Sequence, residues 1–181
     1  ERFAETLIEH GPRMIEFFRR HTALDFVDGN AIPDFHDRSP GSRNGGRSLC
    51  AAPFDGRQLG RRIDDLEPPL DLVSPFGMGV ASGADLRHFF NSRRSLKSLL
   101  HVVGRLARHF RDLAIHGRGL HLVAGNALVA RLTKSADDLG VRFRLATAAR
   151  APLVEAGRVV GLTVEGPEGP SEIRARRGVA L

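Results

Sequence analysis

The chain has 181 residues, 41% of them hydrophobic, which is enough to bury one core of ordinary size. Its 27 Lys and Arg residues against 21 Asp and Glu residues give a net charge of +6, and nearly all of the positive charge is arginine. No apolar run reaches the roughly 20 residues of a membrane span, and the N-terminal sequence lacks a secretory signal pattern. The single Cys50 excludes an internal disulfide and favours a reducing, cytoplasmic location.

The first part of the chain combines one helical pattern with a long irregular segment. Residues 2–20 repeat apolar side chains at helical spacing, with Gly11-Pro12 as a predicted kink or break. A short strand is expected at 24–27. Residues 29–60 are rich in Gly, Pro, Asp and Arg but contain regularly placed apolar residues, which predicts a long ordered loop. Loops of this length in a compact domain are usually functional.

The remainder of the chain predicts helices followed by a β-meander. Helices are expected at 85–90 and 96–113, where the leucines fall on one face, and at 127–139, ended by Gly140. The side chains expected to face inward from this last helix are Leu128, Val129, Leu132, Ala136 and Leu139. Strands are then expected at 141–146, 149–155, 158–165, 171–176 and 178–181, with turns at 155–157 and 166–169. The predicted fold class is α/β, and the helix and meander together occupy 124–181.

One glycine-rich segment, residues 76–83, superficially resembles a phosphate-binding loop that opens a helix. A dinucleotide fingerprint requires a strand directly before the loop and an acidic residue about twenty positions later. Pro75 interrupts the approach, and Ser82 stands at the third glycine position. The sequence therefore favours a surface turn.

The other candidate sites are a basic helix face and a group of histidines. The basic side chains are Arg93, Arg94, Lys97, Arg105, Arg108 and Arg111. They suit either a solvated face or a non-catalytic module that binds an acidic partner; nucleic acid is disfavoured because no base-reading motif accompanies them. The histidines at 101, 109, 116 and 121 lack the spacing of a paired metal motif, so no metal site is predicted.

Two regions carry the strongest functional pattern. The first is the loop with Ile32-Pro-Asp-Phe-His36, Gly45-Gly-Arg-Ser-Leu49 and Pro53-Phe-Asp-Gly-Arg-Gln-Leu-Gly60. The second is the succession G-N-A-L-V-A-R-L, L-G-V, G-R-V-V-G and A-R-R-G-V-A-L after residue 124. Together they resemble the flavoprotein family of fumarate reductase, succinate dehydrogenase flavoprotein subunits and 3-ketosteroid Δ1-dehydrogenases, with the steroid-dehydrogenase branch the most similar.

This resemblance implies that FAD is the cofactor. The strand that begins near Ala148 resembles the one whose backbone contacts the adenine of FAD, and Thr147 and Ala149 beside it are small enough to let a ring approach. The fold implied is a partial, Rossmann-like FAD-binding domain with a helical layer and the C-terminal β-meander. Because the chain ends on the apolar Gly178-Val-Ala-Leu181, we expect residues 1–181 to be an internal fragment of one such domain.

The resemblance also places a substrate-side loop. A tyrosine of the steroid-dehydrogenase branch that helps remove a substrate proton corresponds to Phe35, which has no hydroxyl. His36 is adjacent and titratable. Gly45 and Gly46 would let the backbone approach a ligand, and Arg47 would either contact substrate or hold the loop through Asp34 or Asp55.

The implied activity is hydride transfer between a carbon of a small-molecule substrate, steroid-like or dicarboxylate-like, and FAD. The fragment itself is expected to be inactive and to hold FAD weakly or not at all, and no catalytic residue is assigned. The alternative is the basic binding module of the Arg93–Arg111 helix. No membrane partner is expected, and exposed core faces at Phe3, Val179 and Leu181 favour some self-association.

Overall fold

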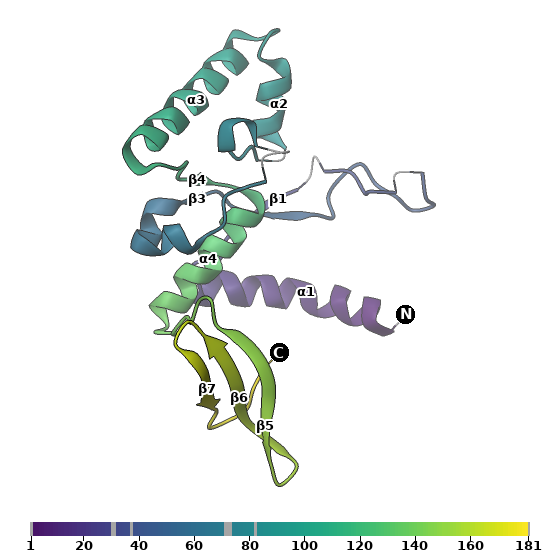
Figure 1. Ribbon diagram of the computed structural model, residues 1–181. Helices are drawn as coiled ribbons and strands as arrows, with labels where there is room; N and C mark the ends of the chain where they lie inside the picture. The colour runs from purple at the N-terminus through teal and green to yellow at the C-terminus, as the bar shows by residue number, and fades with distance from the viewer. Residues whose placement is uncertain (1, 30–31, 37, 71–73, 82, 181) are drawn as a thin grey trace. The chain divides into compact units, whose positions relative to one another are not determined.

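The computed structural model describes residues 2–29, 32–36, 38–70, 74–81 and 83–180 (Figure 1). The chain forms two compact units, Glu1–Gly140 and Val141–Leu181. The predicted mixture of helices and strands is confirmed.

Among the described residues, the first unit contains all of the helices and two small antiparallel sheets. In chain order its elements are α1 (Arg2–His21), β1 (Phe26–Asp28), β2 (Leu49–Ala51), β3 (Phe54–Asp55), the 3-10 helices η1 (Gly56–Asp65) and η3 (Pro75–Gly77), α2 (Ala84–Asn91), α3 (Leu96–His116), β4 (His121–Leu122) and α4 (Ala124–Asp138). β1 pairs with β2, and β3 pairs with β4. Residues 29–60, predicted as one loop, thus contain two short strands and the start of η1.

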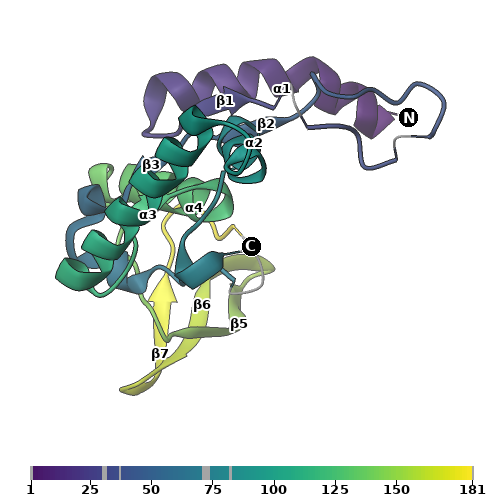
Figure 2. The same ribbon diagram turned by 90° about the horizontal axis from the view of Figure 1, so that it is seen from above.

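α1 is continuous across the Gly11-Pro12 pair, so the predicted break is wrong. Proline disturbs a helix mainly through its missing N–H and its contact with the preceding turn, and tertiary context can tolerate both. The helix lies beside β2 (Figures 1 and 2), and its apolar side chains are largely exposed, Phe3 by 94%. Of the other two residues expected to expose core faces, Val179 in the second unit is partly buried, and Leu181 lies outside the described residues.

The core of the first unit lies where α4 crosses η1 and the β3–β4 pair. Its buried members are Phe54, Leu59, Leu122, Ala127 and Ala130. The two alanines are 0% exposed, whereas Leu139, at the end of the predicted inner stripe, is 73% exposed. The prediction that the side chains of this stripe face inward is therefore wrong for Leu128, Val129, Leu132 and Leu139, which are all exposed, while Ala136 is partly buried. Alanine lets the helix backbone lie close to the short strands, and this places the bulkier side chains away from them.

Arg131 joins α4 to the chain segments on either side of the first sheet. Its Nε donates to the carbonyl of Ala52 at 2.9 Å, Nη1 to that of Ala23 at 2.6 Å, and Nη2 to that of Pro53 at 2.8 Å. The guanidinium carbon also lies 5.4 Å from the centre of the Phe54 ring. One turn later Ser135 Oγ accepts the Ala23 N–H at 2.9 Å. Four backbone groups that lack a ladder partner, three carbonyls and one N–H, are thereby satisfied by one helix face.

α3 packs with its polar face inward. Its buried residues are Ser98, Arg105, His109 and Asp112, while Leu100 is 63% and Val103 is 53% exposed. Asp112 is only 1% exposed and accepts a hydrogen bond from Arg57 Nη2 at 2.6 Å. The expectation of a solvated basic face is thus wrong at Arg105.

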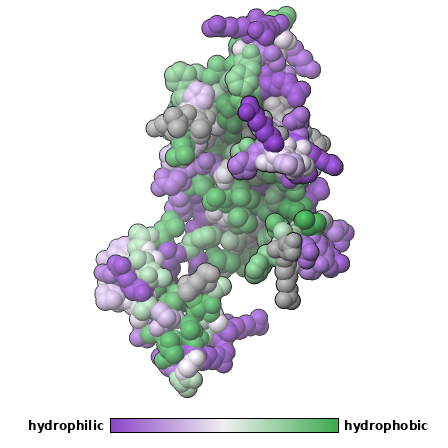
Figure 3. Space-filling view, turned by 90° about the vertical axis from the view of Figure 1, so that its right-hand side faces the viewer, coloured by the Kyte–Doolittle hydropathy of each residue, from purple (hydrophilic) through white to green (hydrophobic). Residues whose placement is uncertain are grey.

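Figure 3 shows apolar side chains, in green, lying among charged ones on the visible surface. Within the described residues, no helix combines the length and apolar character that crossing a bilayer requires.

The second unit is a three-stranded antiparallel meander of β5 (Ala148–Glu155), β6 (Arg158–Gly166) and β7 (Gly169–Arg174), in that order. The two predicted turns are confirmed, and in the first Ala156 and Gly157 have φ of 49° and 77°, as a tight hairpin turn with two positive φ values requires. The strands predicted at 141–146 and 178–181 are wrong over the described residues: neither 141–146 nor 178–180 is a strand, and the sheet consists of β5, β6 and β7.

Replacing Arg131 by Ala should lower the free energy of unfolding of the first unit by about 3 kcal/mol, because three carbonyls lose charge-assisted donors and the Phe54 ring loses its cation. Chemical denaturation measures this change. The matched control is Arg87→Ala, an exposed arginine in α2, which should change stability by less than about 0.5 kcal/mol. Equal effects of the two substitutions would contradict the role given to Arg131.

Candidate functional site

The residues implied by the sequence fall in two places, one in each unit. Phe35, His36, Gly45, Gly46 and Arg47 belong to the loop that joins β1 to β2 in the first unit. In the second unit, Ala148 and Ala149 begin β5, and Thr147 directly precedes it. Each place is described by itself.

The β1–β2 loop is organised around the carboxylate of Asp34. Its Oδ2 accepts hydrogen bonds from the backbone N–H of Arg43 and from Arg47 Nη1, both at 2.9 Å. Arg47 Nη2 also donates to the Gly41 carbonyl at 2.8 Å, and the Asp34 N–H donates to the Arg43 carbonyl at 2.9 Å. The prediction that Arg47 holds the loop through Asp34 is confirmed. The other carboxylate considered, Asp55, pairs instead with Arg57 at 3.1 Å.

The loop begins and ends at a narrow neck. Gly29 N–H donates to the Ser48 carbonyl at 2.8 Å, directly after the β1–β2 pairs. A Cβ on Gly29 would lie 2.6 Å from that carbonyl oxygen, so only glycine fits there. Within the loop Gly46 has φ of 82°, a conformation that favours glycine. The loop therefore has a fixed neck and an internal ion pair.

Phe35 lies beside this ion pair with its side chain 100% exposed, and His36 is exposed as well. Both line a cavity of about 380 Å³ together with Arg47 and other loop residues. A fully exposed aromatic side chain is available to a ligand or to another surface. The cavity offers an apolar ring, an imidazole and one guanidinium side by side.

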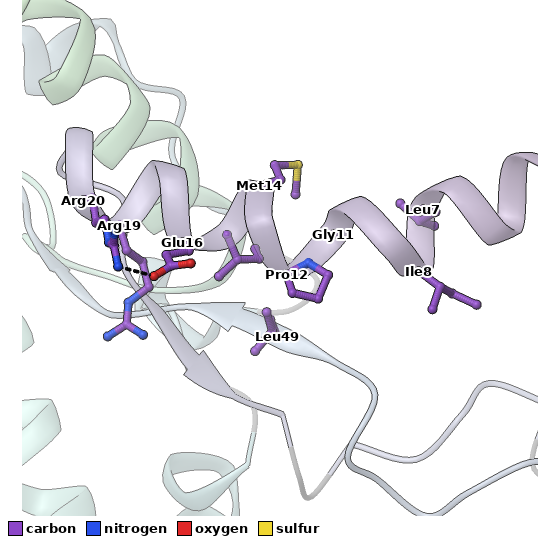
Figure 4. A pocket seen from close by; sticks show the side chains of 10 residues that line it. Leu7, Ile8, Gly11, Pro12, Met14, Glu16, Arg19, Arg20 and Leu49 are labelled. Carbon is purple, nitrogen blue, oxygen red and sulfur yellow. Dashed lines mark hydrogen bonds and ion pairs between the residues drawn. The ribbon is translucent and has the colours of Figure 1, made fainter.

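A larger apolar groove, about 910 Å³, lies between α1 and Leu49 at the start of β2 (Figure 4). Leu7, Ile8 and Met14 line it, and the Glu16–Arg20 ion pair lies at one end. No residue singled out from the sequence as a site residue belongs to it.

In the second unit, Ala148 and Ala149 lie on an edge strand. They pair with Glu165 and Val164 of β6, and an irregularity in the register follows at Ala151. Both methyl side chains are exposed, and β5 has no second neighbour among the described residues. The opposite edge of such a strand presents backbone N–H and C=O groups. Small side chains on an open edge fit the approach of a flat heterocycle, as a backbone contact to adenine requires.

The chain turns sharply into this edge. Ala146 has φ of 48°, and Thr147 Oγ1 donates to the Leu145 carbonyl at 2.9 Å. Thr147 also lines a cavity of about 350 Å³ between Arg144 and the β6–β7 turn. Thr147 is therefore a turn residue beside the edge, and Ala148 is the first residue of the strand.

The glycine-rich segment 76–83 does not have the form of a phosphate loop. The segment begins within η3 (Pro75–Gly77), and the Ala81 N–H donates to Asp85 Oδ2 at 3.0 Å. A carboxylate of the chain itself thus takes the place that a phosphate would occupy near the start of α2. The interpretation as a surface turn is supported; Ser82 lies outside the described residues.

Residues 1–181, the whole chain, match the FAD binding domain family, and the chain belongs to that family. It is therefore part of an FAD-binding domain of a flavoprotein. Within the described part, the small exposed residues of the β5 edge agree with this assignment.

The relatives it is similar to are dehydrogenases. It is 34% identical to 4-oxocyclohex-2-ene-1-carboxylate 5-dehydrogenase of Sinomonas cyclohexanicum, over 94% of this chain and 29% of the relative. It is also 34% identical to 3-oxosteroid 1-dehydrogenase of Mycolicibacterium smegmatis, over 98% of this chain and 31% of the relative. The crystal structure of 3-ketosteroid Δ1-dehydrogenase from Sterolibacterium denitrificans, in complex with 1,4-androstadiene-3,17-dione, superposes with a TM-score of 0.76 at 26% identity, over 94% of this chain and 31% of that one. The chain spans about a third of the length of these proteins.

The sequence reasoning missed the polar residues that α3 buries. Ser98, Arg105, His109 and Asp112 are spaced seven, four and three residues apart, which places them on one helix face. This spacing was the available signal, but the leucines on the other face gave a stronger apolar pattern.

Replacing Asp34 by Ala should loosen the β1–β2 loop without unfolding the unit, because it removes the acceptor shared by Arg43 and Arg47. Hydrogen exchange of the amides at 38–48 is expected to quicken by roughly fivefold, while stability changes by less than about 1 kcal/mol, as for other partly exposed ion pairs. Asp64→Ala, at an exposed carboxylate of η1, serves as the control. Unchanged exchange in the loop of the Asp34 variant would show that the ion pair does not order it.

Proposed function

We propose that the whole protein containing these residues is an FAD-dependent dehydrogenase that moves a hydride between a carbon of its substrate and the flavin. The observation that carries the proposal is the match of residues 1–181 to an FAD-binding family. It is supported by relatives whose names describe oxo groups on carbon rings. We infer a steroid-like cyclic ketone as the substrate class, with dicarboxylate-like compounds as the alternative.

The role proposed for the second unit is to contact the adenine end of FAD. Backbone groups of Ala148 on the open edge of β5 would pair with the ring, and the small Thr147 and Ala149 would leave room for it. Bound FAD supplies the acceptor for the hydride. The protein contributes binding and orientation, and a backbone contact requires no particular side chain.

The role proposed for the β1–β2 loop is to contact substrate. Phe35 offers an apolar ring face and cannot carry a proton, because it has no hydroxyl. His36 beside it is the titratable group of this segment. Gly45 and Gly46 allow close approach of the backbone, and the Asp34–Arg47 ion pair holds the loop in shape.

For residues 1–181 alone we propose weak or no FAD binding and no turnover. Among the described residues, the only glycine-rich segment preceding a helix already pairs its Ala81 amide with Asp85, so it offers no cradle for a pyrophosphate. An absorbance spectrum of these residues purified alone should lack a stoichiometric flavin band, and the presence of one would contradict this statement.

The substrate proposal is tested in the whole protein by anaerobic reduction of the flavin. A 3-oxosteroid and 4-oxocyclohex-2-ene-1-carboxylate should bleach the flavin band, and succinate should not. Bleaching by succinate alone would favour the dicarboxylate alternative, and no bleaching by any of the three would contradict the proposed activity.

Phe35→Tyr should change the pH profile of reduction because it adds a titratable hydroxyl beside the substrate, whereas Phe35→Leu should not.

The adenine contact is tested by blocking the strand edge. Ala148→Leu should weaken FAD binding by the whole protein about tenfold, equivalent to roughly 1.4 kcal/mol, because the larger side chain obstructs the ring. Val154→Leu enlarges an exposed residue near the other end of the same strand and should leave affinity unchanged. Fluorescence titration of the apoprotein with FAD measures both. Equal affinities for the two variants would remove Ala148 from the site.

A further inference from the structure

A polar cavity of about 460 Å³ lies in the first unit between α2, α3 and the β3–β4 region, apart from the residues assigned to flavin or substrate. Asp85 comes from α2, His101, Arg105 and Arg108 come from successive turns of α3, and His121 comes from β4. Two arginines and two histidines therefore face a single carboxylate.

Arg105 is a buried cation whose donors are only partly used. Its side chain is 9% exposed, and Nη2 donates to the Gly79 carbonyl at 2.7 Å and to Asp85 Oδ2 at 3.3 Å. Its Nε–H is buried and has no acceptor among the described residues. Buried donors are normally satisfied, so an unpaired one in the wall of a cavity needs an explanation. An acceptor that enters the cavity and draws the guanidinium toward it provides that explanation.

The carboxylate of Asp85 is already hydrogen-bonded to other groups of the protein. It accepts from His101 Nε2 at 2.6 Å and from the Ala81 N–H at 3.0 Å. Burial alone raises the pKa of this carboxyl, but the hydrogen bonds from His101 and Ala81 and the charge of Arg105 outweigh burial and hold the pKa below its usual value. Asp85 is therefore ionised and offsets one arginine.

Arg108 supplies the second, uncompensated charge. It lines the same cavity, its side chain is exposed, and it makes no hydrogen bond or ion pair within the described residues. The pKa of the His121 imidazole is lowered, first by burial and then by the positive charges of Arg105 and Arg108. The cavity thus retains net positive charge near a neutral imidazole.

We propose that this cavity binds an oxyanion, the carboxylate or phosphate group of a small ligand. Arg108 and His121 would donate to it directly, and Arg105 would provide the buried charge behind them. Charge-assisted bonds to carboxylate or phosphate are the strong hydrogen bonds of arginine. The proposal does not depend on flavin binding, because none of its residues belongs to the segments assigned to FAD or substrate.

The test is calorimetric titration of the whole protein with sulfate and with acetate, against sodium chloride at matched ionic strength. Arg108→Gln should weaken binding of the preferred ion about fivefold or more, the loss expected for one charge-assisted contact. Lys97→Gln removes the same charge from the same helix outside the cavity and should change affinity by less than about twofold. Preference for sulfate indicates a phosphate-like ligand, and preference for acetate indicates a carboxylate. Binding no tighter than that of chloride, or equal losses in the two variants, overturns the proposal.

A second readout uses the proton on His121. The groups that face it are Arg105 and Arg108 from α3, Asp85 from α2 and Asp55 from β3. A bound anion offsets the arginines and raises the pKa of His121, so binding takes up a proton. Affinity for sulfate, whose charge is constant over this range, should rise as the pH falls from about 8 to about 6. The same pH dependence in His121→Gln would show that His121 does not contact the anion.

Discussion

The first unit depends on the three carbonyl contacts of Arg131. Its strands are two or three residues long, too short to be stable as isolated pairs. Carbonyl groups between β2 and β3 and after α1 have no ladder partner. The guanidinium of Arg131 on α4 donates hydrogen bonds to these carbonyls. Since Ala127 and Ala130 bring the same helix close to β3 and β4, hydrogen bonding and core packing rest on one helix face. The loop that begins after β1 and returns as β2 is positioned by that face.

α3 buries polar side chains and exposes apolar ones, the reverse of the usual distribution. This helix shows why the positions of the helices could be predicted from the sequence and their buried faces could not. The helices near 85–90, 96–113 and 127–139, the stop at Gly140 and both hairpin turns follow from local signals: apolar period, positive-φ glycines and caps. The face that each helix buries is not a local property. Leu100 and Val103 form a regular apolar stripe, yet the polar stripe with Arg105 and Asp112 is buried, because Asp85 and Arg57 lie opposite it. Those partners are 20 and 55 residues away in sequence, and no periodicity within the helix reveals them.

The same distinction applies to the site residues. The sequence offered Asp34 or Asp55 as partners for Arg47, because both carboxylates lie in the same glycine-rich segment, and the structure shows Asp34. The absence of strands at 141–146 and 178–180 was not predictable, because alternating apolar residues form a strand only where another strand pairs with them, and that pairing is not a local property of the sequence. Among the described residues, β5 and β7 each pair on one side only, so the meander retains open edges. An edge of this kind exposes backbone N–H and C=O groups, and the adenine contact proposed for β5 would use them without depending on side-chain identity.

The neck between Gly29 and Ser48 has a consequence for how this family can vary. The ends of the loop are fixed to each other by β1, β2 and the hydrogen bond at the neck. The closure entropy of a flexible loop grows only slowly with its length, by roughly 0.6 kcal/mol for each doubling. Residues can therefore be inserted or deleted beyond the neck at little cost to the unit that carries them. Homologous proteins can in this way change the size of the surface around Phe35 while keeping the same scaffold beneath it.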